Sequence, residues 1–336
     1  MQQKRPMFSA IIAAYNIEKY IKKCMDSILK IANDELEVIV VIGRETDRTN
    51  QICREYCERK NIRLIQQNGV GLSNARNCGL DKATGRYIFF IDGDDSVCPQ
   101  NLKNFLNEIL KLVERYKVDA VLNDFYFTTI EEKILIENKQ IQTQKNKFKD
   151  KQYIEHVVTA GGTFWNTWRY LFSKDYLQKN NFYFKENSVC EDLDFAVRIM
   201  MDTDRIWFCH MPYYNYCPIR SDSLTNKKNN KMTQDSLKIQ RELRKILKEK
   251  DTILSKAVLA KLDELAILCL PDVYEVDKVE KKLCAEEYKF FFRQEPVEEK
   301  HLYKLIASIC KTDGIYIVSF LLFCMKKIRR KRRYKV

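Results

Sequence analysis

Short apolar runs alternate with amphipathic segments over the first hundred residues of this 336-residue chain. The runs predict buried strands, and the segments between them carry apolar residues at helical spacing. Strict alternation of strand and helix predicts an α/β fold with a Rossmann-like, mostly parallel sheet covered by helices, whose ligand site lies at the carboxyl ends of the strands. The predicted strands are 8–14, 36–42, 62–66 and 87–91, and the predicted helices are 18–31, 49–60 and 73–83.

The fourth apolar run ends abruptly in three carboxylates, Asp92, Asp94 and Asp95. A buried strand would deliver them to the sheet edge, where such a cluster is costly unless a cation balances it. Hard oxygen ligands favour a divalent metal that carries a diphosphate. The other interpretation is a polar strand-to-helix turn, in which Asp95 or Ser96 caps the helix that follows Pro99. The cluster alone does not separate these two interpretations.

Further motifs surround the cluster in a fixed order. The first predicted strand ends in Tyr15 and Asn16, and Gly-Leu-Ser-Asn-Ala-Arg-Asn lies within the segment 67–79. With these motifs and the Asp-x-Asp of residues 92–94, roughly two-thirds of the chain resembles the inverting glycosyltransferases of family 2. The resemblance implies the GT-A fold, a nucleotide-sugar donor and a divalent ion, Mn²⁺ or Mg²⁺.

The resemblance also implies roles for single residues. Asp92 and Asp94 would hold the metal and the ribose-diphosphate end of the donor, while Tyr15 and Arg76 would frame the nucleotide. The metal would offset the negative charge that develops on the leaving diphosphate. We expect a metal-dependent, hexosyltransferase-type enzyme with a donor that is UDP-linked.

Gly43 is the main departure from the family pattern, because members commonly have there the Asp that hydrogen-bonds a uracil ring. Three explanations are open. Arg44 or Glu45 makes the base contact instead, the donor carries another base, or the chain is a catalytically degenerate binding or scaffold protein at the membrane. Because the other motif residues are present, we favour an active transferase.

A second informative region contains Trp165 and Asn166, followed by the pair Glu191 and Asp192 at the start of a predicted helix. In the family, the Asp of such a pair is the usual catalytic base. An acceptor hydroxyl must lose its proton as it attacks the sugar carbon, so a carboxylate is needed opposite the departing diphosphate. We expect Asp192 to be this base, with Glu191 as the second candidate. The other interpretation is a helix start enriched in acids because of the helix dipole.

Arg220 follows a tyrosine-rich segment, where its guanidinium would either clasp a phosphate of the donor or form a surface ion pair. Three regions are expected: a nucleotide-sugar-binding half of the GT-A domain, an acceptor-binding half and a C-terminal helical extension. Their predicted ranges are 1–100, 101–225 and 226–336. Within the second region we expect a strand over 120–127 and a polar surface excursion over 131–151.

The net charge of +13 is concentrated at the C-terminus, because residues 326–336 hold eight basic side chains and no acidic one. Residues 315–325, just before them, are largely apolar. This combination predicts attachment to an anionic membrane surface. A buried last helix with a solvated tail is the alternative, and we do not expect nucleic-acid binding because no aromatic side chains interleave with the basic run.

No segment has the roughly 18 to 20 apolar residues needed to span a bilayer, so we do not expect an integral helical membrane protein. Twelve cysteines without a Cys-x-x-Cys pair, and only three histidines, argue against a zinc site and for a reducing cytoplasm. The overall expectation is transfer of a sugar to a hydroxyl of a glycan or lipid-linked acceptor in cell-surface polysaccharide synthesis. The expected place is the inner face of a bacterial plasma membrane.

Overall fold

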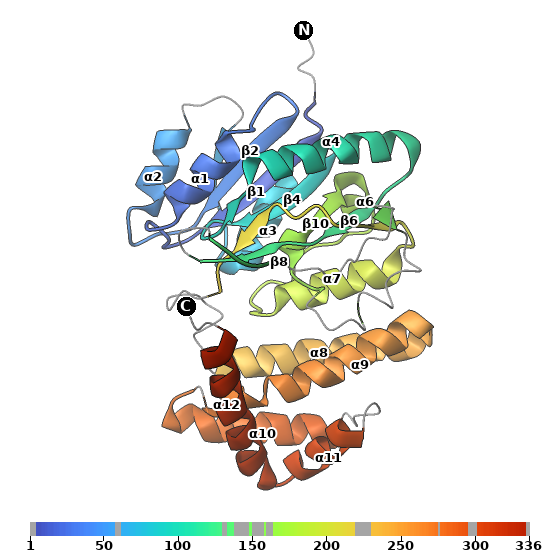
Figure 1. Ribbon diagram of the computed structural model, residues 1–336. Coiled ribbons are helices and arrows are strands. Elements are labelled where there is room, and N and C mark those ends of the chain that lie inside the picture. The colour runs from blue at the N-terminus through green and yellow to red at the C-terminus, as the bar shows by residue number, and fades with distance from the viewer. Residues whose placement is uncertain are drawn as a thin grey trace. The chain divides into compact units, whose positions relative to one another are not determined.

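Two compact units make up the computed structural model of the protein (Figure 1). The first comprises Met1–Asn187 and Glu191–Arg220, and the second comprises Ser188–Cys190 and Ser221–Val336. The structure describes residues 5–57, 62–129, 133–137, 148–149, 158, 164–218, 230–274, 276–294 and 301–333. Arg220 therefore lies outside the described residues, and its predicted phosphate contact stays a prediction.

The first unit is built on a sheet with the strand order β3-β2-β1-β4-β10-β6-β11-β9. Neighbours among β3, β2, β1 and β4 are parallel, β10 is antiparallel to both of its neighbours, and β9 is antiparallel to β11. The strands are β1 (Phe8–Ala14), β2 (Leu36–Ile42), β3 (Ile62–Gln66), β4 (Tyr87–Asp92), β6 (Ala120–Asn123), β9 (Phe148–Lys149), β10 (Tyr170–Ser173) and β11 (Ile206–Cys209). The predicted α/β, mostly parallel fold is confirmed, and three of the four predicted strands match residue for residue.

Helices cover both faces of this sheet. All seven residues of β1 are buried, and successive side chains of a strand point to opposite faces. On one face, β1 shares a core cluster with α1, α2 and α4. On the other face, α3 approaches β1 so closely that a Cβ at Gly79 would overlap Ile11, and Phe195 of α7 stacks on Phe184. The helices of this unit are α1 (Ile21–Leu29), α2 (Thr49–Tyr56), α3 (Gly71–Lys82), α4 (Pro99–Arg115), α6 (Lys174–Lys179), α7 (Glu191–Asp202) and the 3₁₀ turn η2 (Thr167–Arg169).

The strand predicted over residues 120–127 is wrong as a single element. It is two strands, β6 in the main sheet and β7 (Tyr126–Thr128) in a smaller sheet. The break falls at Asp124, whose fully buried carboxylate pairs with Arg169 at 3.1 Å and lies 2.8 Å from Nδ1 of His210. A buried carboxylate is costly without such partners, and the chain changes sheets where it meets them.

The polar segment predicted as a surface excursion also contains sheet structure. β8 (Ile134–Glu137) pairs antiparallel with β7, and β9 adds an edge to the main sheet. The smaller sheet has the order β5-β12-β7-β8, with β5 (Ser96–Val97) and β12 (Tyr214–Tyr216) joining segments far apart in the sequence. This pairing brings the tyrosine-rich segment beside the carboxylate cluster that follows β4.

The second unit is helical, as expected from its periodic apolar pattern. Its core joins side chains of α8, α9, α10, α11 and α12, including Leu237, Ala266 and Tyr288. Its elements are α8 (Asn230–Lys250), α9 (Ile253–Leu268), η4 (Leu270–Tyr274), α10 (Lys278–Gln294), α11 (His301–Cys310) and α12 (Gly314–Arg333). Within the described ranges, no helix combines the length and apolar character that crossing a lipid bilayer requires.

Candidate active site

Several of the predicted site residues lie at or near the carboxyl end of β4. Asp92 is the last residue of this strand, and the Gly93 N–H donates to the Ala13 carbonyl oxygen at 3.1 Å. A Cβ at Gly93 would lie 2.6 Å from a methyl carbon of Ile17 and 2.8 Å from the Ala13 oxygen. A glycine is therefore required between Asp92 and Asp94, because the backbone here lies directly against the end of β1.

Arg76 connects the two groups of carboxylates that the sequence predicts. Its guanidinium donates to Asp92 at 2.8 Å, to Asp192 at 2.6 Å and to Glu191 at 2.9 Å. The side chain is 2% exposed and faces the Phe184 ring, with 5.3 Å between the guanidinium carbon and the ring centroid. A residue of α3 thus brings the end of β4 and the start of α7 into one site.

The charges in this site do not balance, since one guanidinium faces three carboxylates. Burial and the neighbouring Asp192 raise the pKa of Glu191 to about 8, although Arg76 acts in the opposite direction. Burial also raises the pKa of Asp192, against the lowering effect of Arg76. A carboxylate with a raised pKa is a stronger proton acceptor when it is ionised, as a general base requires.

Thr167 fixes the orientation of Asp192. Its hydroxyl donates to one carboxylate oxygen at 2.7 Å, and its backbone N–H donates to the other at 3.3 Å. Thr167 begins the turn η2, directly after the Trp165 and Asn166 motif. Thr167 was not predicted to have a role, although its place in the aromatic motif was the available signal.

Tyr214 organises the other end of the carboxylate cluster. Its hydroxyl donates to Asp95 at 2.9 Å and accepts from the Asp92 backbone N–H at 3.1 Å. The alternative prediction that Asp95 or Ser96 caps α4 is wrong, because the residue before this helix is Cys98 and no side chain caps it. Asp95 instead holds β12 against the end of β4, a contact that depends on strand pairing rather than on local sequence.

A divalent ion fits this cluster chemically. One carboxylate oxygen from each of Asp92, Asp94 and Asp95 lies within 4.8 Å of the others. Such hard oxygen donors are the ligands that Mn²⁺ and Mg²⁺ prefer. Asp92 and Asp94 are the better candidates, because Asp95 is only 5% exposed and is bonded to Tyr214.

Tyr15 lies at the neighbouring strand end, with 57% of its surface exposed. Asn16 adopts φ 51°, a conformation that Asn tolerates better than most residues, and its side chain accepts from the Thr46 N–H at 2.8 Å. This turn ties the end of β1 to the loop after β2. The Tyr15 ring therefore stands at the edge where the predicted nucleotide would lie.

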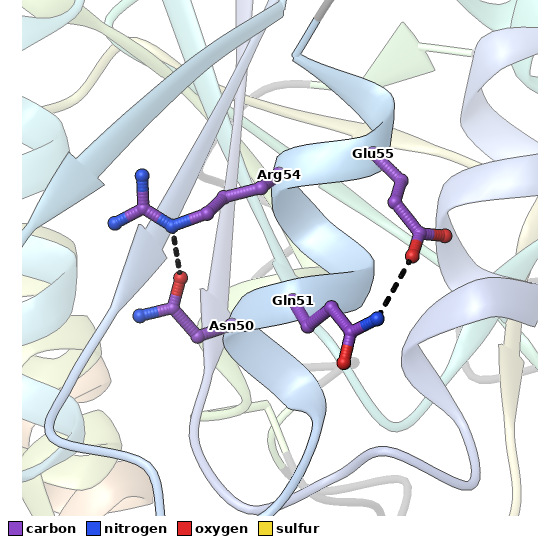
Figure 2. A pocket seen from close by; sticks show the side chains of 4 residues that line it. All are labelled: Asn50, Gln51, Arg54 and Glu55. Atoms are coloured by element: carbon purple, nitrogen blue, oxygen red, sulfur yellow. Dashed lines mark hydrogen bonds between the residues drawn. The ribbon is translucent and has the colours of Figure 1, made fainter.

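A surface hollow on α2 is unrelated to these groups. It is lined by four side chains of this one helix, Asn50, Gln51, Arg54 and Glu55 (Figure 2). Arg54 donates to Asn50 at 2.7 Å and Gln51 donates to Glu55 at 3.4 Å, so these side chains pair along the helix surface. The hollow contains none of the carboxylates described above.

Comparison with known proteins identifies the family to which this chain belongs. The family model described as Glycosyl transferase family 2 matches residues 9–177, just over half of the chain. The chain belongs to glycosyl transferase family 2. The matched region contains the Arg76 segment and the carboxylate cluster, while Glu191 and Asp192 follow it.

One sequence relative and two solved structures are also similar to this chain. The uncharacterized glycosyltransferase EpsJ of Bacillus subtilis is 31% identical over 216 residues, which cover 63% of this chain and 61% of EpsJ. The structure of Staphylococcus aureus TarS 1–349 in complex with UDP-GlcNAc matches with a TM-score of 0.66 at 19% identity, over 98% of this chain and 93% of that one. The mannosyltransferase PcManGT from Pyrobaculum calidifontis, in complex with GDP-Man and Mn²⁺, gives a TM-score of 0.52 at 15% identity, over 98% and 88% of the two chains. The fold is GT-A.

Within this family fold, the predicted site residues occupy different surroundings. Asp92, Glu191 and Asp192 all contact Arg76, whereas Tyr15 lies at the exposed end of β1. The guanidinium of Arg76 forms buried ion pairs with these three carboxylates, which the sequence did not indicate. Its prediction as a nucleotide contact stays a prediction.

Proposed function

We propose that this protein transfers a sugar from a UDP-linked donor to a hydroxyl of a glycan or lipid-linked acceptor in cell-surface polysaccharide synthesis. The proposed reaction is a single in-line displacement that depends on a divalent metal and inverts the anomeric carbon. The observation that carries this proposal is the contact set of Arg76. It joins Asp92, from the cluster suited to a metal and a diphosphate, to Asp192, the candidate base.

Asp192 is proposed to accept the proton of the acceptor hydroxyl as its oxygen attacks the sugar carbon. Thr167 and Arg76 hold the carboxylate in one orientation through bonds of 2.7 Å and 2.6 Å. Asp92 and Asp94 would hold the divalent ion, which when bound offsets the charge on the leaving diphosphate. Asp92 would thus lie toward the leaving group and Asp192 toward the attacking one.

The TarS complex supports the choice of a UDP-linked donor, and the PcManGT complex supports the choice of a divalent metal. TarS, a poly(ribitol-phosphate) β-N-acetylglucosaminyltransferase, has been solved with UDP-GlcNAc, and PcManGT with GDP-Man and Mn²⁺. Gly43 is the observation behind the alternative, a degenerate binding or scaffold protein. Nucleotide release from UDP-, GDP-, CDP- and dTDP-sugars, with Mn²⁺ or Mg²⁺ and with a chelator, separates the two. The transferase proposal expects chelator-sensitive release of UDP, and no release from any donor would favour the scaffold.

Replacing Asp94 with Ala should abolish most of the metal-dependent turnover. Loss of several kcal/mol of charge stabilisation at the diphosphate corresponds to a rate decrease on the order of 10²-fold or more. Initial rates measured across a Mn²⁺ titration test this, with Glu114→Ala, an exposed acid on α4, as the matched control. Full metal-dependent turnover in Asp94→Ala would show that the metal assignment is wrong.

Helix α12 supports a further partner, a membrane surface. One side of the helix is in the core of the second unit, where Ile315 and Ser319 are fully buried. Four apolar side chains on α12 are 48 to 67% exposed, at the spacing of one helix face: Ile317, Phe320, Leu321 and Met325. The buried side fits the interpretation of this segment as a packed last helix, and the exposed side fits its interpretation as a membrane-binding surface.

We propose that this exposed face, defined by the four residues above, lies on an anionic lipid surface. The eight basic residues of 326–336 follow it directly, and they complement the charge of anionic head groups. An apolar face and a basic cluster together give stable but reversible attachment. We therefore propose a peripheral protein at the cytoplasmic face of a bacterial plasma membrane.

The double substitution Phe320→Ser and Leu321→Ser should weaken binding to vesicles of phosphatidylglycerol and phosphatidylcholine by about tenfold or more. Co-sedimentation at low salt measures this, and Ile253→Ser, a 69% exposed side chain on α9, is the control. High salt should reduce binding of the unmodified protein. Equal binding to vesicles of pure phosphatidylcholine would contradict the proposed anionic membrane surface. A dimer of the unmodified protein that the double substitution disrupts and Ile253→Ser does not would instead show that a second copy of the chain covers this face.

A further inference from the structure

The space beside Gly43 is already filled. A Cβ built on Gly43 would lie 3.0 Å from a ring carbon of Tyr15 and 3.1 Å from the side-chain nitrogen of Gln67. Both distances are tighter than ordinary van der Waals contact, so both side chains would have to shift by a few tenths of an ångström to admit a Cβ here. The ring of Tyr15 and the carboxamide of Gln67 therefore meet where the family commonly has a carboxylate.

The backbone fixes Gln67 at this position. Its N–H donates to the Ile42 carbonyl oxygen at 2.9 Å, which continues the pairing of β2 and β3 past the last residue of β3. The preceding Gln66 has a structural task, since its side chain donates to the carbonyl oxygens of Ile42 and Gly43. The carboxamide of Gln67, by contrast, has no hydrogen-bond partner in the part of the chain that the structure describes, and the side chain is only half-buried.

A half-exposed carboxamide beside an exposed aromatic ring suits a nucleobase. Tyr15 offers a flat apolar face on which a base can stack, and every base presents such a face. A carboxamide offers one acceptor and two donors on a single planar group. It can therefore pair with the edge of uracil, where N3–H lies next to a carbonyl. With its two ends exchanged, it can also pair with cytosine, where an acceptor nitrogen lies next to an amino group.

We propose that Gln67 is the residue that contacts the base of the donor nucleotide, in place of a carboxylate at position 43. The inference rests on the proposed transferase function and adds its pyrimidine specificity. An aspartate accepts only and selects the N3–H of uracil, whereas Gln67 satisfies either pyrimidine. The unmodified protein therefore binds UDP and CDP with affinities within about tenfold of each other, since no unpaired polar group is left in either complex.

Dissociation constants for UDP and CDP in the presence of Mn²⁺, measured by calorimetry on the full chain, test this assignment. Gln67→Leu should weaken both by about 3- to 10-fold, the effect of one hydrogen bond. Gln67→Glu keeps the acceptor and loses the donors, so it should raise the preference for UDP over CDP by about tenfold or more. Gln51→Leu, on the exposed surface of α2, is the control.

The outcomes separate the inference from the function on which it rests. The role of Gln67 would be overturned if Gln67→Leu left both dissociation constants unchanged, or if Gln67→Glu left the ratio of UDP to CDP affinity unchanged. The transferase proposal would still stand in that case, provided that the unmodified protein binds UDP. An unmodified protein that binds UDP more than a hundredfold tighter than CDP would also overturn it. An unmodified protein that binds no nucleoside diphosphate would overturn both, and thermal unfolding of each variant confirms that its fold is retained.

Discussion

Replacing Asp192 with Asn lowers turnover by about 10²- to 10⁴-fold and leaves donor affinity close to that of the unmodified protein. The amide keeps the shape of the carboxylate and an oxygen for Arg76, whose bond to Asp192 is 2.6 Å. It cannot accept the acceptor's proton at neutral pH. Steady-state rates and UDP affinity measured on the same preparation test both parts, with Asp194→Asn on the same turn of α7 as the control, since Asp194 pairs with Arg198 at 2.7 Å.

The pH profile gives a second signature of the same residue. Because burial raises the pKa of Asp192, with Arg76 opposing the rise, the base takes up its proton at a higher pH than an exposed aspartate with a pKa of about 4. Turnover of the unmodified enzyme should therefore fall as the pH is lowered, starting above the range of an ordinary aspartate. Asp192→Asn should lack this part of the profile, and an identical acid limb in both proteins would assign it to another group.

Replacing Arg76 with Met should produce the largest loss of stability, about 3 to 5 kcal/mol in the free energy of unfolding at pH 8. The side chain is 2% exposed, and its removal leaves Asp92, Glu191 and Asp192 without their shared cation. Urea unfolding measures the change. Arg63→Met is the control, because its ion pair with Glu37 is 3.5 Å long and the arginine is 44% exposed, where such pairs contribute about 0 to 1 kcal/mol.

The loss in free energy of unfolding caused by Arg76→Met should become smaller as the pH falls from 8 toward 5.5. The pKa of Glu191 is already raised to about 8 by burial and Asp192, and loss of the guanidinium raises it further. The guanidinium also lowers the pKa of Asp192, so its loss raises that pKa as well. At each pH between the lower pKa values of the unmodified protein and the higher ones of the variant, the folded variant binds more protons than the folded unmodified protein. The stability of the variant therefore gains more as the pH falls through that window. A deficit independent of pH would show that lost packing, and not uncompensated charge, causes the destabilisation.

The first four strands could be predicted from the sequence because each is a short, mainly apolar segment bounded by polar turns. Central strands of a parallel sheet are buried on both faces, as β1 and β2 are, so their apolar character identifies them without knowledge of distant contacts. The strand over 120–127 was predicted as one element for the same reason. Its division at Asp124 depends on Arg169, a partner that local pattern does not reveal.

Local sequence has the same limit at the site. Asp92, Asp94, Glu191 and Asp192 belong to recognisable motifs, so they could be proposed from the sequence as candidates. The contacts of Arg76 with three of them, Asp92, Glu191 and Asp192, could not be predicted. Arg76 lies 116 positions from Asp192 in the sequence, and the two meet only because α3 and α7 cover the same face of the sheet. The sequence predicted a nucleotide contact for this arginine, which stays a prediction, but it did not indicate the buried contacts of the guanidinium with the carboxylates.

Thr167 and Tyr214 were missed for a related reason. Each lies in a segment noted for its aromatic residues, but its importance comes from hydrogen bonds to a carboxylate that lies far away in the sequence. Hydroxyl groups are common throughout the sequence and give no signal by themselves. Gln67 is similar, since its position beside Gly43 follows from the pairing of β2 with β3 and not from any motif.

The anomeric configuration of the transfer product tests the central claim most directly. NMR spectroscopy of the product formed from an α-linked UDP-sugar, with the acceptor in excess and Mn²⁺ present, reads this configuration from the coupling at the anomeric proton. A single displacement assisted by Asp192 predicts a β-linked product. An α-linked product would mean retention of configuration, and would contradict both the role of Asp192 and the single-site mechanism built around Arg76.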